Sequence, residues 1–436
     1  MTATMNAAPA GPALIAGSAS SLNFGGGPSP APSYHAGVIP QDRLVRKEVA
    51  LGVVREIVPP QNFIGLSTIA PFLEVPTDDV IFQYAQGLVD GLAPARAEDA
   101  ESETYQRDDT FLSEGRASVI DWAIKDHYSA SDVSKYREWI AIQELMRNTG
   151  RLPLTAESAT EGWQARLARD TQRRRRRLDV RMEWLIMTAI STGAIAYNDG
   201  KIKFTVDYGR PTQQALVPGG SMTSTDGGTV TLGASGWLKN DGTGDPIGDL
   251  LKIQNWAYDT YGVRLNRAIA SRKALSGLWN SSKFTARTGL ITNASASVQS
   301  AIIDPKYVID GWSPQAAQQI IENATQISFI EYDSVYRERA LGSTTVTNTR
   351  FLPANRIILL PDESDLAEFD DTEIGFGKML TSPHPAGNWT AGYYEWEKEY
   401  GVDPWGYDVG TGIKAFPVFL HMDKTFTYDL DLSGVA

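Results

Sequence analysis

The spacing of apolar residues along the chain predicts a mixture of helices and strands. The longest helical pattern covers residues 158–191. Its apolar positions recur at intervals of three or four residues, as in Leu178, Met182, Leu185 and Ala189. At 1.5 Å per residue such a helix is about 50 Å long, far longer than a typical globular helix, so we expect it to act as a structural strut.

Shorter patterns predict strands and three further helices. The strand-like segments are residues 79–86, 116–128, 201–208, 229–232, 263–269, 327–332, 356–360 and 417–426. One further helix is expected to begin after Ser131 and end before Gly150. A second is expected after Asp245 and a third over residues 313–323. Ser and Asp are favoured N-caps, and Pro fits the first helical position. The mixture predicts an α+β fold in which strands distant in sequence share sheets.

Three segments lack such regular patterns. Residues 1–38 are rich in Ala, Gly, Pro and Ser and cannot bury enough apolar area to offset their backbone entropy, so we expect an N-terminal arm. Residues 57–72 are apolar but contain three prolines, which favours an extended segment. Residues 87–115 form a long polar loop, which we interpret as a projecting hairpin. Within it, residues 90–114 carry eight acids against two arginines, a net charge of −6.

Composition excludes several classes of site. The chain has 436 residues, enough for one large or two to three ordinary domains, and is 42% hydrophobic, which suffices for a core. Its net charge of −12 argues against a dedicated nucleic-acid binder. The absence of cysteine excludes disulfides, thiolate metal sites and cysteine nucleophiles. We expect no signal peptide and no transmembrane helix, because the N-terminal segment lacks a basic region and no apolar run approaches 18 residues.

Five consecutive arginines, residues 173–177, are the strongest local signal in the sequence. Residues 166–183 contain eight arginines and three acids, a net charge of +5. Five successive helical residues turn through about 400°, so these arginines encircle the helix and do not form one phosphate-binding stripe. A nucleic-acid contact and a solvated helix face are both open. The overall acidity of the chain favours a third interpretation, in which these arginines form ion pairs with acidic segments of neighbouring copies.

No motif indicates a catalytic or metal site. Residues 241–245 are best read as a turn with a helix cap, and the seven acids of residues 362–373 as a solvated loop. The histidines lack metal-ligand spacing; they are His35, His127, His384 and His421. We expect no cofactor and no enzymatic activity. The aromatic cluster in residues 389–407 could form a sugar-binding platform, although packing or a subunit interface is the better reading.

Several segments, in this order, resemble the lambda-type major head protein family of tailed bacteriophages. The segments that show the resemblance are Gly65-Leu66-Ser67-Thr68-Ile69-Ala70-Pro71-Phe72, the Arg-rich start of the long helix, residues 202–210 ending in Asp-Tyr-Gly-Arg, Phe351-Leu352-Pro353-Ala354-Asn355-Arg356, and Lys414-Ala415-Phe416-Pro417-Val418-Phe419-Leu420. The resemblance covers residues 57–432. It implies the Hong Kong 97-type capsid fold.

The resemblance also implies a domain organisation. Residues 1–75 would form the N-terminal arm and residues 76–130 the extended E-loop hairpin. Residues 131–246 would form the peripheral domain, with the spine helix at 158–191 and a β-hairpin. Residues 247–436 would form the axial domain together with strands that return to the peripheral domain.

The implied function is that of a major capsid protein. Copies would assemble in the host cytoplasm into hexamers and pentamers of an icosahedral head shell. The shell would be part of the virion and would enclose double-stranded DNA, which it contacts only weakly and nonspecifically. We also expect separate scaffold and portal proteins as partners, and consider a decoration protein. We expect no contact with a membrane. The alternatives are a carbohydrate-active or carbohydrate-binding protein and a phage tail or adaptor protein.

The candidate site residues are inter-subunit contacts. The family pattern lays the acidic loop of one subunit across its neighbour, and the opposite charges of the loop and the helix suggest that the two segments meet. The acidic residues are Asp90, Glu98, Asp99, Glu101, Glu103, Asp108 and Asp109. The basic residues are Arg166, Arg169, Arg173, Arg174, Arg175, Arg176, Arg177 and Arg181.

Overall fold

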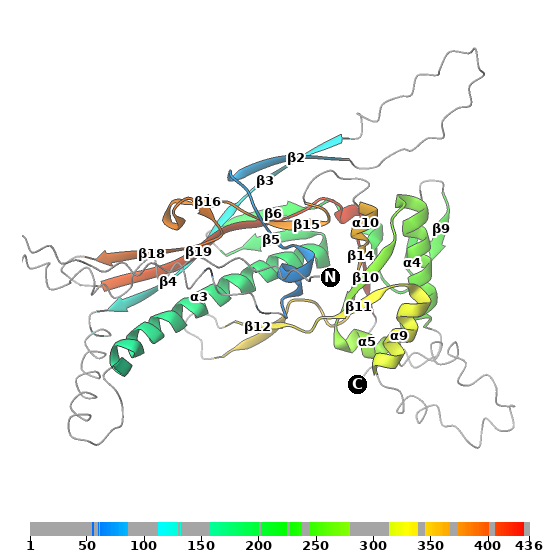
Figure 1. Cartoon of the computed structure of the whole chain (residues 1–436). Helices are drawn as coiled ribbons and strands as arrows, with labels where there is room; N and C mark the ends of the chain where they lie inside the picture. Colours follow the sequence, from blue (N-terminus) through cyan, green and yellow to red (C-terminus); the bar gives the residue numbers. More distant parts are fainter. Residues whose placement is uncertain are drawn as a thin grey trace, which may run out of the picture. The chain divides into compact units, whose positions relative to one another are not determined.

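A computed structural model provides the coordinates (Figure 1). The described residues are 55, 60, 62–85, 112–129, 131, 157–199, 202–224, 227–234, 236–237, 244–279, 314–338, 345–366, 374–400 and 406–430. All of them belong to one compact unit, residues 45–436. The predicted helix after Ser131, the arm over residues 1–38 and the loop tip over residues 86–111 lie outside the described residues, apart from Ser131 itself.

Helix α3 (Glu157–Thr192) is the longest described element, with 36 residues and a length of about 54 Å. It confirms the predicted strut to within one residue at each end. The helix ends where Gly193 adopts a positive φ of 78°, the left-handed conformation that suits glycine at a helix C-terminus. The predicted apolar stripe is completely buried, with Met182, Leu185 and Ala189 at 0% exposure.

Beside α3 lies a five-stranded sheet. Its strands are β1 (Phe72–Glu74), β15 (Gly377–Thr381), β19 (Gly406–Phe419), β18 (Tyr393–Tyr400) and β4 (Ile120–Ser129). The 14-residue β19 pairs with β15, β18 and β4, and α3 packs against β19. This arrangement buries the first hydrophobic core between the helix and the sheet. The buried part of the helix, residues 171–191, is therefore packed against strands that come from both halves of the chain.

A second sheet and its helices enclose the second core. The strand order is β11 (Ser328–Glu331), β10 (Leu265–Ala270), β14 (Arg356–Pro361), β20 (Phe426–Asp429) and β7 (Ala215–Leu216). The helices are α4 (Pro246–Tyr261), α5 (Arg272–Trp279) and α9 (Pro314–Thr325). As predicted, Asp245 caps α4: its Oδ1 accepts the Gly248 N–H at 3.0 Å, and Pro246 takes the first helical position. In this core Trp237 stacks on Tyr428 with ring centroids 4.3 Å apart.

Five two-stranded ribbons and several short helical turns complete the described structure. The ribbons pair β2 (Asp79–Ala85) with β3 (Leu112–Ser118), β5 (Ala194–Asn198) with β6 (Lys203–Asp207), β8 (Ser221–Thr223) with β9 (Thr229–Thr231), β12 (Val335–Glu338) with β13 (Thr347–Arg350), and β16 (Pro383–His384) with β17 (Thr390–Ala391). The short turns are η2 (Gly65–Ile69), η4 (Thr212–Gln214), α10 (Glu363–Leu366), η5 (Pro385–Gly387) and η6 (Met422–Lys424). The antiparallel pairing of β2 with β3 confirms a hairpin around the acidic loop.

Three sequence-based boundaries are wrong. Residues 57–72 are not simply extended, because residues 65–69 form the helical turn η2, held by a buried carboxylate of α3. The single strand predicted over residues 116–128 is divided at Val119, whose N–H bonds to the Asp78 carbonyl at the base of the hairpin. The strand predicted over residues 417–426 is the end of β19, the turn η6 and the start of β20, which belongs to the other sheet. In all three places a tertiary contact overrides the local pattern.

Candidate functional site

Helix α3 divides its run of arginines between the core and the surface. Each residue advances about 100° around the helix, so five in a row must face all sides. Arg174 and Arg175 are buried, with 1% and 4% exposure, whereas Arg173, Arg176 and Arg177 are exposed. The run therefore serves two purposes: two arginines hold the helix to the sheet, and three form a basic face.

Arg174 joins α3 to three strands through a buried network. Its Nη2 lies 2.9 Å from Glu395 Oε1 on β18, and its Nη1 lies 2.8 Å from Asp126 Oδ2 on β4. Its Nε donates to Thr411 Oγ1 on β19 at 3.0 Å. Burial alone would lower the pKa of Arg174, but the hydrogen bond to Asp126 and the charge of Glu395 raise it. Burial raises the pKa of Glu395, and the charge of Arg174 opposes that rise.

Arg175 forms a second buried contact on the adjacent side of α3. Its Nε donates to Asp179 Oδ1 at 2.9 Å, one helical turn further on. Its guanidinium carbon lies 3.0 Å from the centroid of the Tyr393 ring, a cation–π contact. The Tyr393 hydroxyl donates to the same Asp179 oxygen at 2.6 Å. Burial first, and then the charge of Asp179, raise the pKa of Tyr393 well above its ordinary value.

The exposed arginines lie along one side of α3. Arg169, Arg173, Arg176 and Arg177 are exposed positions at helical spacing. Arg173 Nη1 lies 3.4 Å from Oδ1 of the half-buried Asp170, one helical turn before it. This side of the helix carries more positive than negative charge.

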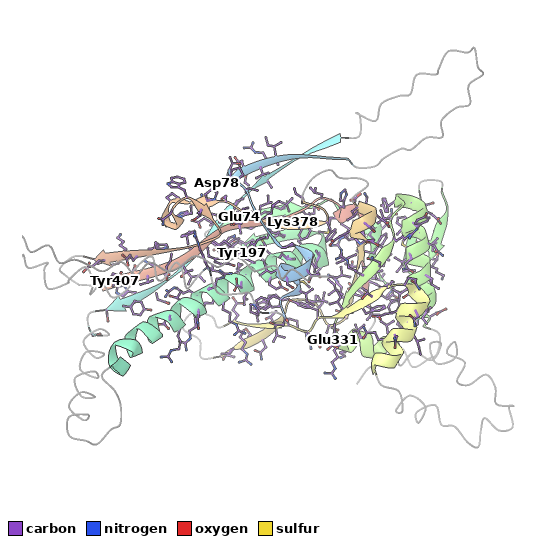
Figure 2. The ribbon with its side chains drawn as sticks, viewed as in Figure 1. Glu74, Asp78, Tyr197, Glu331, Lys378 and Tyr407 are labelled. Carbon is purple, nitrogen blue, oxygen red and sulfur yellow. The ribbon has the colours of Figure 1, made fainter. Side chains whose placement is uncertain are left out.

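The other predicted contact residues are placed as follows. Arg181 is only partly exposed, and its guanidinium lies 5.2 Å from the ring centroids of both Trp184 and Tyr197, so its contacts are within the chain. Tyr197 is labelled on β5 (Figure 2). Arg166 belongs to α3, but its side chain is outside the described part of the chain. The acidic partners all lie outside the described residues; they are Asp90, Glu98, Asp99, Glu101, Glu103, Asp108 and Asp109.

Asp78 fastens the base of the β2–β3 hairpin to the first sheet (Figure 2). Its Oδ1 accepts the Ser382 hydroxyl at 2.6 Å, and its Oδ2 lies 2.8 Å from Lys414 Nζ on β19. The hydrogen bonds from Lys414 and Ser382 lower the pKa of Asp78, so the carboxylate stays ionised. These contacts fix where the hairpin leaves the body of the molecule.

A buried glutamate of α3, which sequence reasoning missed, holds the turn η2. Glu183 is completely buried, and its Oε1 accepts the Gly65 N–H at 3.0 Å and the Tyr332 hydroxyl at 2.6 Å. Its Oε2 accepts the Leu66 N–H at 2.9 Å. Burial raises the pKa of Glu183, and the three donors oppose that rise. A single acid within an apolar helix stripe was the available signal, but its partners are more than one hundred residues away.

A second missed cluster surrounds Asp408 near the start of β19. Its carboxylate accepts the Tyr400 hydroxyl at 2.8 Å and lies 2.9 Å from Lys125 Nζ and 2.5 Å from His127 Nδ1. Burial would raise the pKa of Asp408, but the hydrogen bonds from Lys125, His127 and Tyr400 lower it to about 2. The cluster joins β4, β18 and β19 at one end of the sheet, and it is part of the sheet's support.

The aromatic cluster does not form a platform. Tyr393, Tyr394 and Tyr407 are buried, with 6%, 2% and 7% exposure. Tyr394 lies opposite Gly412, where an added Cβ would come within 2.4 Å of the tyrosine ring, so the ring fills the space that glycine leaves on β19. Trp389 is the exception among the described members of the cluster, with 72% exposure. Three of the six described rings are buried and Trp396 and Tyr400 are half-buried, which favours the packing interpretation over sugar binding.

No group of metal-binding type occurs among the residues that the structure describes. His421 is buried, and burial together with the charge of Lys424 lowers its pKa to about 3, so it is neutral. His384 stacks on Tyr394, and His127 pairs with Asp408. Over the same described ranges, no helix has the length and apolarity to cross a membrane.

Comparisons with known proteins agree with this architecture. A family model described as phage major capsid protein E matches residues 50–368. No curated protein matches the chain. A structure assigned to a prophage capsid protein of E. coli CFT073 has 15% sequence identity and a TM-score of 0.51, covering 89% of this chain and 99% of that one. A phage-related protein from Bordetella bronchiseptica RB50 has 14% identity and a TM-score of 0.43, covering 88% and 97%.

The family match and the structural likeness lead to one conclusion. At 15% identity, the likeness to the E. coli structure shows a shared fold, and this is the α+β, Hong Kong 97-type capsid fold that the resemblance implied. The family match covers more than half of the 436 residues. The chain therefore belongs to the phage major capsid protein E family and is a structural protein of the phage head shell.

Proposed function

We propose that copies of this chain assemble into hexamers and pentamers of an icosahedral shell around double-stranded DNA, and that the basic side of α3 binds the acidic loop of a neighbouring copy. The observation that carries the contact is the row of exposed arginines on a long helix anchored to a sheet by Arg174 and Arg175. Exposed side chains on a rigid helix can meet a neighbour in a reproducible geometry.

The domain assignment belongs to the same proposal. The α3 core, with its sheet, would be the peripheral domain, and the α4–α5–α9 core would be the axial domain. Two hydrophobic cores support this division: one lies mainly between α3 and its sheet, and the other among α4, α5, α9 and the second sheet, whose strands β10 and β14 contribute residues to both. The β2–β3 hairpin would carry the acidic loop outward from the Asp78 anchor. Among the described strands β2 and β3 pair only with each other, and an isolated two-stranded hairpin is marginally stable, so a contact with a neighbouring copy would stabilise it.

Charge supplies the attraction between the two segments. Residues 90–114 carry a net charge of −6 and residues 166–183 a net charge of +5. Because Arg174 and Arg175 are buried, the contact depends on the exposed residues Arg169, Arg173, Arg176 and Arg177. One exposed ion pair contributes only about 0–1 kcal/mol, so the effect must come from repetition of the same contact around a closed shell.

The partners follow from the same surface properties. A net charge of −12 leaves the inner wall weakly repulsive toward DNA, which keeps packaged DNA mobile. We propose that the chain is not an enzyme, that assembly takes place in the host cytoplasm, and that separate scaffold and portal proteins take part. A decoration protein would strengthen the shell where cysteine crosslinks are impossible.

The test reverses charges that the structure shows to be exposed. Arg176→Glu with Arg177→Glu should lower shell yield in electron micrographs and sedimentation, and reversing Asp108 and Asp109 to Lys should restore it. Lys203→Glu with Arg272→Glu is the matched control, because both residues are exposed and lie outside α3. Circular dichroism confirms that the variants fold.

The outcomes separate the contact from the function. Normal shell yield from the double reversal would contradict the α3 contact but leave shell assembly standing. A wild-type chain that remains monomeric under all assembly conditions, including co-expression with scaffold, would contradict the proposed shell itself.

A further inference from the structure

The turn between β16 and β17 presents a tryptophan to solvent in a strained conformation. Trp389 is 72% exposed, the most exposed large apolar side chain among the described residues. Its φ is 57°, and Asn388 before it has the same value, so two successive side-chain-bearing residues adopt the left-handed conformation. For a bulky residue this conformation is a true outlier, and it persists only where the surroundings impose it.

The surroundings of the turn do impose it. The Trp389 N–H donates to the His384 carbonyl at 3.2 Å, which closes the turn. The His384 ring stacks on Tyr394, with centroids 3.9 Å apart and planes 12° from parallel. Arg55 Nη2 donates to the Gly387 carbonyl at 3.2 Å. The indole is therefore held out from the body on a braced turn, which limits the entropy lost when it is bound.

The chemistry of the turn favours a protein partner. Its other exposed residues are Pro385, Asn388 and Thr390, which are uncharged. The cation beside the turn, Arg55, already donates to the Gly387 carbonyl and the Thr390 hydroxyl. The neighbouring rings of Tyr393 and Tyr394 are buried, so the exposed indole lacks the further rings of a sugar platform. A single exposed tryptophan on a rigid turn is typical of an interface anchor.

The ribbon β12–β13 offers a matching surface on the same chain. Val335 is 48% exposed and Val346 is 52% exposed, and the exposed Arg337 lies two residues after Val335, on the same face of β12. Tyr336 points the other way and packs on Phe351 with ring centroids 5.0 Å apart, which fixes the face that Val335 and Arg337 present outward. An arginine next to an exposed valine suits an indole, because the pair offers both apolar area and cation–π attraction.

We propose that Trp389 of one copy binds the outer face of the β12–β13 ribbon, at Val335 and Arg337, of a second copy of this chain. This contact rests on the proposed function, because it takes place between copies in the shell. β16 and β12 lie on opposite sides of α3 (Figure 1), so one copy can donate its tryptophan and receive another at the same time. Such a head-to-tail contact forms a ring when the rotation between successive copies closes, which is the geometry that a capsomer needs.

Crosslinking from position 389 tests the contact directly. A photoreactive phenylalanine analogue replaces Trp389, and unlabelled copies are mixed with nitrogen-15-labelled copies before assembly. Mass spectrometry should find mixed-isotope crosslinks between position 389 and residues 335–350. Crosslinks that join 389 to any other region of the chain, or to a scaffold or decoration protein, would overturn the proposal. The same analogue at Ile202, which is 51% exposed, is the control for random collision.

Substitutions provide an independent measurement. Trp389→Gly relieves the left-handed strain, so the unassembled subunit should melt at an unchanged or higher temperature while shell yield falls about tenfold, as expected for loss of an anchor residue. Arg337→Glu should lower shell yield in the same direction, and Ile202→Ala should leave it unchanged. Wild-type yield from Trp389→Gly would contradict the contact. If the wild-type chain forms only small rings that crosslink from position 389 to residues 335–350, the result would support the Trp389 contact and contradict the proposed icosahedral shell.

Discussion

Replacing Arg174 with methionine should strongly destabilise the subunit, although the residue lies within a run of arginines that reads as a surface feature. The side chain is 1% exposed and donates to Glu395, Asp126, Thr411 and Thr171 at distances between 2.8 and 3.0 Å. Methionine has a similar length and is apolar, so it preserves much of the packing but removes the charge and every donor.

The magnitude follows from the charge that is left behind. Glu395 is 2% exposed, so without Arg174 its carboxylate stays buried and unpaired. Breaking one side of a buried ion pair costs about 3–5 kcal/mol, more than the pair itself contributes relative to apolar residues. We therefore expect Arg174→Met to lower the free energy of unfolding by about 3–5 kcal/mol.

Equilibrium urea unfolding of the unassembled subunit, followed by circular dichroism and checked for refolding, measures this loss. Arg176→Met is the matched control, because Arg176 is exposed two residues away and should change stability by no more than about 0.5 kcal/mol. Arg174→Met combined with Glu395→Leu removes both charges and should recover at least about 2 kcal/mol of the loss. A loss below about 1 kcal/mol, or two single effects that simply add, would refute the reasoning.

Two further predictions concern the clusters that support the sheet and the turn η2. Gly65→Ala should lower the free energy of unfolding by about 1–3 kcal/mol, because its Cβ would lie 2.6 Å from Glu183 Oε2 in a buried site. Gly228→Ala is the control, because the nearest atom to its Cβ would be Ser224 Oγ at 3.4 Å. Equal urea midpoints for the two variants would contradict the expected clash. Because the pKa of Asp408 is lowered to about 2 from an ordinary 3.8, its contribution is present above pH 3.8 and lost as the pH falls through 2. The urea midpoint of Asp408→Asn should therefore lie below that of wild type at pH 6, with a difference that shrinks as the pH approaches 2; a difference that does not change with pH would show that Asp408 stabilises only by shape.

Much of the secondary structure could be predicted from local spacing. Helix α3, the capped start of α4 and the hairpin around the acidic loop all depend on periodicity and turn residues that are close together in sequence. The errors occur where distant contacts override the pattern. Residues 65–69 coil because Glu183 accepts two of their N–H groups, and residues 417–426 divide because the chain passes from one sheet to the other.

The candidate site also depends on contacts between residues that are distant in sequence. The sequence by itself determined that a long helix carries a dense positive charge, that a separate loop carries the opposite charge, and that thiol chemistry is absent. Only the tertiary structure decided that Arg174 and Arg175 are buried against the sheet, and that Trp389 is the most exposed of the described rings in its cluster. The reason is physical: charge and helical period are properties of neighbouring residues, whereas burial depends on which distant strands pack against them, as β18 and β19 pack against α3.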